Sequence, residues 1–146
     1  MSLDSLRRVK ERAEEAVMME LAQITRDLTD MERRCDALTA QLESDAAVFL
    51  VHAEQGMAIE TMLEWQGRMD NERAAVQQGR RRIAELTDRW KQAQARLVVA
   101  TQERKVLDRL AERQQAAHGA DMQRREQRAT DEAATRLRLW SGKGLS

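Results

Sequence analysis

Apolar residues in the first third of the chain recur at alternating steps of three and four. Between residues 21 and 42 they are Leu21, Ile24, Leu28, Met31, Cys35, Leu38 and Leu42. This spacing is the a/d heptad pattern, which places one apolar stripe along an α-helix. Because such a stripe is buried only against another stripe, the pattern predicts a coiled coil and requires a partner helix.

The stripe, here called the first seam, continues less regularly toward the N-terminus. Its upstream positions are Leu3, Leu6, Val9, Ala13 and Val17. Ser2 or Asp4 is the expected N-cap, since short polar side chains accept hydrogen bonds from the free N–H groups of a first turn. The first helix is therefore predicted over residues 3 to 52.

A second seam with the same spacing begins at residue 62. It comprises Met62, Trp65, Met69, Glu72, Val76, Gly79, Ile83, Leu86, Trp90, Ala93, Leu97, Ala100, Arg104, Leu107 and Ala111, with Glu72, Gly79 and Arg104 as its weak points. Gly56 lies between the seams and tolerates the left-handed backbone of a helix end. We therefore expect a turn over residues 53 to 58 and a second helix over 59 to 140, in one antiparallel hairpin domain spanning residues 1 to 146.

Hairpin geometry also predicts where burial stops. If the chain reverses near residue 55, residue i lies opposite about 110 minus i, so the first helix covers the second to about Leu107. The apolar seam stops after Ala111, and the next positions are Gln114, His118, Asp121 and Arg125. The second helix should therefore extend past its partner as a charged tail, with residues 141 to 146 frayed.

Composition supports this all-α architecture. The chain has no proline, and Ala, Arg, Leu, Glu and Lys make up 77 of 146 residues, close to the share typical of long helices. Only 27 residues are Leu, Ile, Val or Phe, too few for a globular core of this length. Residues 1 to 55 carry a net charge of −5 and residues 56 to 146 a net charge of +5, which favours pairing of the two arms.

Several functional classes lack any motif. Cys35 is the only cysteine, and two histidines far apart give no metal-ligand spacing. No glycine-rich phosphate loop and no catalytic constellation is present, so we expect no enzyme activity and no cofactor. The Arg80 to Arg82 cluster has acidic neighbours and no interleaved aromatics, so nucleic acid is not expected as a partner. No apolar run is long enough to span a membrane, which predicts a cytoplasmic protein.

Single residues in the seams have ordinary structural interpretations. Cys35, Trp65 and Trp90 are expected to be core residues. Trp140 differs because it lies beyond the region covered by the first helix, where no facing helix is expected to bury it. It is a candidate anchor for a partner protein, since buried tryptophans often dominate protein interfaces.

Five segments of the chain resemble one known family. Residues 101–114 read TQERKVLDRLAERQ, and they are followed by REQ at 125–127 and DEA at 131–133. The opening, with LRRVKE at 6–11 and AEE at 13–15, has a similar counterpart. Together with the length and the glycine-bearing turn, these segments resemble flagellar FliJ proteins, whose second helix carries an arginine-lysine pair, a leucine, Glu-Arg and a charged stretch ending near Asp-Glu.

The resemblance implies a non-enzymatic stalk of the flagellar type III export apparatus. Members of this family form an antiparallel coiled coil, insert its open end into the hexameric export ATPase and contact the cytoplasmic domain of the export gate protein. They are also described as chaperone-like, so export chaperones are further candidate partners. The protein would then lie at the cytoplasmic face of the inner membrane, peripheral to it through these partners alone.

The resemblance also suggests where each partner binds. The candidate ATPase contacts, at the open end of the hairpin, are Arg7, Arg8, Lys10, Arg104, Lys105, Arg109, Glu112 and Arg113. The gate-facing surface of the family lies nearer the turn and includes aromatic residues. The corresponding candidates are Leu38, Leu42, Phe49, Trp65 and Met69, although this chain has no tyrosine.

Three alternatives remain at this point. A general coiled-coil scaffold would form an extended parallel homodimer without a sharp turn. The equivalent stalk of a virulence secretion system would have the same architecture in a different apparatus. Alternatively, hairpins would dimerise through the four consecutive apolar residues 48–51, which exceed what one seam buries.

Overall fold

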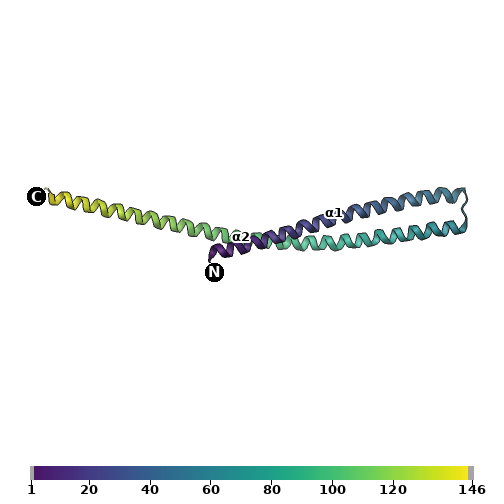
Figure 1. Cartoon of the computed structure of the whole chain (residues 1–146), viewed down its shortest axis with the longest axis horizontal. Helices are drawn as coiled ribbons and strands as arrows, with labels where there is room; N and C mark the ends of the chain where they lie inside the picture. Colours follow the sequence, from purple (N-terminus) through teal and green to yellow (C-terminus); the bar gives the residue numbers. More distant parts are fainter. Residues whose placement is uncertain (1, 145–146) are drawn as a thin grey trace. The chain divides into compact units, whose positions relative to one another are not determined.

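The computed structural model describes residues 2–144, and there it contains two α-helices joined by a short turn (Figure 1). Helix α1 spans Leu3–Gln55 and helix α2 spans Ile59–Gly144. The prediction of an all-α fold with two long packed helices, the second being longer, is confirmed. The extended rod without a turn is wrong, because the chain folds back on itself after α1.

The helix ends follow from local chemistry. The Ser5 N–H donates to Ser2 Oγ at 3.2 Å, so Ser2 is the N-cap of α1. Gly56 has a φ of +100°, and its N–H donates to the Ala53 carbonyl at 3.3 Å. A residue with a side chain would be strained at that φ, so glycine sets the end of α1.

Both helices run further than expected. α1 continues to Gln55 rather than ending near residue 52, since nothing before Gly56 disfavours a helix. α2 continues to Gly144 rather than ending near residue 140, because a single glycine weakens a helix without breaking it. Of the segment expected to be frayed, residues 145 and 146 lie outside the described residues.

The described chain falls into two compact units, which are taken in turn. The hairpin unit is Ala13–Ala100, and the end unit consists of Met1–Arg12 and Thr101–Ser146. In the hairpin unit, α1 and α2 run antiparallel on either side of the turn (Figure 1). Its buried apolar residues all occupy seam positions, and they are Ile24, Cys35, Met69, Val76, Leu86 and Ala93.

Gly79 has a packing role in the hairpin unit. A Cβ atom at this position would lie 3.3 Å from the Sγ atom of Cys35 on the facing helix. The Cys35 thiol is buried and lies 3.7 Å from the Val76 carbonyl oxygen. The weak point at Gly79 is therefore a close approach of the two helices, and Cys35 is a core residue as expected.

In the end unit, burial stops where the seam stops. Leu107 is buried, Ala111 is half-buried, and most side chains that follow are exposed. The upstream seam needs a correction, because Val9 is exposed and Lys10 is half-buried in its place. The next half-buried position of this face after Leu6 is four residues on, at Lys10, rather than three residues on, at Val9. The apolar residues therefore do not follow the buried face at this point.

Ion pairs between the helices give the register. Arg96 donates to both carboxylate oxygens of Glu20 at 2.7 and 2.9 Å in the hairpin unit, and Lys10 pairs with Glu103 at 2.9 Å in the end unit. These pairs are symmetric about residues 56 to 58 rather than the expected residue 55, because the turn is centred on residue 57.

No helix in the described chain is long and apolar enough to cross a membrane.

Candidate partner-binding surfaces

Asp108 organises the candidate ATPase-binding surface of the end unit. Its Oδ1 accepts hydrogen bonds from Arg7 Nε and Nη2 at 3.2 and 3.1 Å, across the two helices. Its Oδ2 accepts a bond from Arg104 Nη1 at 2.7 Å, from one turn earlier on α2. The seam position Arg104 is thus neutralised by a carboxylate, which allows an arginine to be half-buried there.

The structure divides the eight candidate ATPase contacts into two groups. Arg7 and Lys10 are half-buried and join the two helices through Asp108 and Glu103, and the half-buried Arg104 pairs with Asp108 within α2. The other five are exposed and have no ion-pair partner among the described residues; they are Arg8, Lys105, Arg109, Glu112 and Arg113. Four of these five are cations, so the free side chains of this surface carry a positive charge.

Asp108→Asn should loosen the first turns of α1. The amide keeps the shape of the side chain but loses the charge that holds Arg7 and Arg104, and we expect a loss of about 1 kcal/mol. Hydrogen exchange should then show about five-fold lower protection of the amides of residues 6–12. Asp131→Asn is the control, since the Asp131 carboxylate accepts a hydrogen bond from Gln127 of the same helix, on the exposed part of α2. Equal protection in both variants would contradict the role of Asp108.

The candidate gate-facing residues, all in the hairpin unit, differ in accessibility. Leu38, Leu42, Phe49 and Trp65 are half-buried, so each presents part of its side chain to solvent. Met69 is only 4% exposed and lies at a seam position, so its side chain is closed to solvent. Arg68 lies over the Trp65 ring at 5.4 Å from its centroid, a cation–π arrangement that orients the ring.

A polar layer beside these residues was not singled out by the sequence analysis. Asp45 is 5% exposed, and Arg68 Nε lies 3.2 Å from Asp45 Oδ2 and 3.3 Å from Glu72 Oε1. Glu72 was recognised only as a weak point of the second seam. Asp45 could have been found by the same rule, because it lies three residues after Leu42 and continues the first seam.

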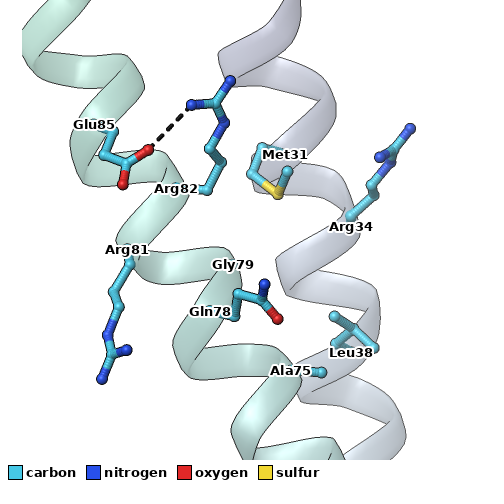
Figure 2. Close-up of a pocket in the computed structure, with 9 residues that line it drawn as sticks. All are labelled: Met31, Arg34, Leu38, Ala75, Gln78, Gly79, Arg81, Arg82 and Glu85. Carbon is cyan, nitrogen blue, oxygen red and sulfur yellow. Dashed lines mark hydrogen bonds and ion pairs between the residues drawn. The ribbon is translucent and has the colours of Figure 1, made fainter.

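A groove of about 500 Å³ opens between the helices at Gly79. Met31 and Leu38 from α1 face Ala75 and Gln78 from α2 across it (Figure 2). Figure 2 shows Arg34 and Arg81 extending away from the facing helix, while Arg82 Nη1 donates to Glu85 at 3.1 Å. Gly79 lies at the base of this groove where the helices approach closely, and Arg81 and Arg82 of the arginine cluster do not converge on one point.

The last third of α2 presents scattered apolar side chains to solvent. Trp140 is 79% exposed, and Leu137 and Leu139 are also exposed. The candidate anchor therefore contacts no core in the described residues, as the end of the seam predicts. The exposure of Trp140 leaves its ring accessible to a partner protein.

One family model matches the chain. It is described as flagellar FliJ protein, and the match covers residues 1–143. No curated protein and no solved structure matches the chain in the other two comparisons.

Proposed function

Because the chain belongs to the flagellar FliJ family, a group of non-enzymatic coiled-coil components of flagellar protein export, we propose that it acts as the stalk of the export ATPase. In this proposal, the end unit enters the hexameric ATPase ring and the turn-proximal part of the hairpin unit contacts the cytoplasmic domain of the export gate. The match is to the flagellar family, so we do not propose the stalk of a virulence system.

The ATPase proposal rests on the contrast, within the end unit, between the buried seam and the exposed part of α2 that follows it. The seam ends at Ala111, and α2 continues to Gly144 with nearly all of its later side chains exposed. The exposed cations Arg8, Lys105 and Arg109 lie beside this transition and lack ion-pair partners among the described residues. A helix that is polar all round has no apolar face to bury against its own chain, so this part of α2 is left accessible to a partner.

The gate proposal depends on the partly exposed residues Leu38, Leu42, Phe49 and Trp65 in the hairpin unit. Trp140 is proposed as an additional anchor, and export chaperones as further partners. The protein would act in the cytoplasm and reach the inner membrane through its partners. The whole chain, residues 1 to 146, is proposed to work as one coiled-coil hairpin domain.

Binding to the cognate flagellar export ATPase tests the proposal directly. The purified full-length chain should bind the ATPase in a titration followed by fluorescence anisotropy, in the presence or absence of nucleotide. A parallel titration with a coiled coil of similar length and zero net charge is the control. Absence of binding with and without nucleotide would overturn the stalk proposal.

A further inference from the structure

The polar layer of the hairpin unit places two carboxylates inside the apolar seam. Asp45 extends from α1, and Glu72 extends from α2 at a seam position. Their side chains are 7% and 14% exposed, far below the exposure of an ordinary surface carboxylate. Placing two negative charges in a seam is unfavourable unless hydrogen bonds and a counter-charge compensate them.

The compensation in this layer is incomplete. Gln41 Nε2 donates to Asp45 Oδ1 at 3.0 Å, and Arg68 Nε donates to Glu72 Oε1 at 3.3 Å. The other two oxygens, Asp45 Oδ2 and Glu72 Oε2, are buried and accept no hydrogen bond. Arg68 contacts both carboxylates, so in their ionised forms one cation faces two anions.

A single proton would supply the missing hydrogen bond and also remove the excess negative charge. Protonation converts one carboxylate into a carboxylic acid, which becomes a hydrogen-bond donor to the other. It also leaves one negative charge opposite the one positive charge of Arg68. Beyond the carboxylates, the hydrogen-bond and ion-pair partners in this layer are the neutral Gln41 amide from α1 and Arg68 from α2.

We propose that Asp45 and Glu72 form a proton-binding site in which one shared proton holds the two helices together beside Trp65. Release of the proton at higher pH restores two anions in the seam and loosens the packing locally. The effect extends to Trp65 because Arg68, the counter-ion of the site, also lies over the Trp65 ring. This site is independent of the proposed ATPase contact, which belongs to the end unit.

The direction of the pH effect follows from Glu72. The hydrogen bond that a protonated Glu72 makes with Asp45, then burial, then the charge of Asp45 raise the pKa of Glu72 above its ordinary value of 4.5, while Arg68 acts to lower it. The folded state therefore binds more protons than the unfolded state between pH 4.5 and the raised pKa. The stabilisation is complete below pH 4.5 and is lost as the pH rises through the raised pKa.

Glu20 produces the opposite pH dependence, so the test must be local. Its hydrogen bonds to Arg96 lower the pKa of Glu20, and that contribution to stability is lost as the pH falls through the lowered pKa. A melting temperature would combine the two effects. Nuclear magnetic resonance of ¹³C-labelled glutamate carboxyls reports each glutamate separately.

In this titration of the full chain, one carboxyl should titrate above pH 4.5, and its signal should disappear in the Glu72→Gln variant. Asp45→Asn should move the midpoint of Glu72 to lower pH, because the asparagine amide donates without carrying charge. Glu85→Gln, which removes an exposed glutamate of α2, should leave the midpoint unchanged. An ordinary midpoint for Glu72, or one that does not respond to Asp45→Asn, would overturn the proposal.

Hydrogen exchange tests the structural consequence in the same protein. Protection factors of amides in residues 41–49 and 65–76 should fall as the pH rises through the midpoint of Glu72. Each pH unit between 4.5 and that midpoint corresponds to about a ten-fold change. The Glu72→Gln variant should lose this pH dependence, because its amide supplies a donor at every pH. Equal pH dependence in the variant and the natural chain would exclude the shared proton as the cause.

Discussion

Leu86→Ala is expected to lower the free energy of unfolding by about 3 kcal/mol, within the ~2 to 5 kcal/mol typical of a buried leucine. Leu86 is 1% exposed and is the largest fully buried side chain in the described chain. The loss of its side chain leaves a cavity between two helices. The seam is narrow, so few neighbouring side chains can move in to fill this cavity. Urea denaturation followed by circular dichroism at 222 nm measures the change.

Leu63→Ala provides the matched control. Leu63 lies on the same helix and in the same unit, but it is 62% exposed. We expect a change below about 0.5 kcal/mol, as for most surface substitutions. Similar losses in the two variants would mean that seam burial does not supply the stability of the hairpin unit.

Reversing three charges of the end unit should weaken binding to the export ATPase by about 100-fold. The variant is Arg8→Glu, Lys105→Glu, Arg109→Glu. These cations are exposed and have no ion-pair partner among the described residues, so their reversal should leave the Arg7 and Asp108 contacts intact. The change removes the charge complementarity that these cations offer to a partner, and a binding titration at low and at physiological salt measures the loss.

A second triple variant controls for net charge. Arg33→Glu, Arg80→Glu, Arg81→Glu makes the same change in total charge at exposed positions of the hairpin unit. We expect its affinity for the ATPase to stay within about three-fold of the natural chain. Equal weakening by both triple variants would indicate non-specific attraction, and the end unit would then not be the binding surface.

Most of the fold could be predicted because the heptad rule is local. All fifteen positions of the second seam, from Met62 to Ala111, are buried or half-buried, including the weak points Glu72, Gly79 and Arg104. Helix geometry alone decides which residues share a face, so the type of side chain at a seam position did not matter. The rule failed at Val9 and Ala13, which are both exposed, because the apolar residues there depart from the spacing that the helix follows.

Less of the candidate site could be predicted, because accessibility depends on pairs of residues. Arg7 and Lys10 were candidate ATPase contacts, and each is held by an acidic residue of α2 about one hundred positions away. Met69 was expected on a contact surface and is buried. Neither outcome is visible in a single helix, since both depend on the exact register of the two helices.

By itself, the sequence determined the two helices, the turn at Gly56, the end of burial at Ala111 and the resemblance to the flagellar family. These properties follow from spacing along one chain and from the backbone freedom of one residue. Only the tertiary structure decided which charges are engaged and that Asp45 and Glu72 share a layer with Arg68. The physical reason is that hydrogen bonds and ion pairs require atoms within about 3 Å, and a shift of two residues in register would change every one of them.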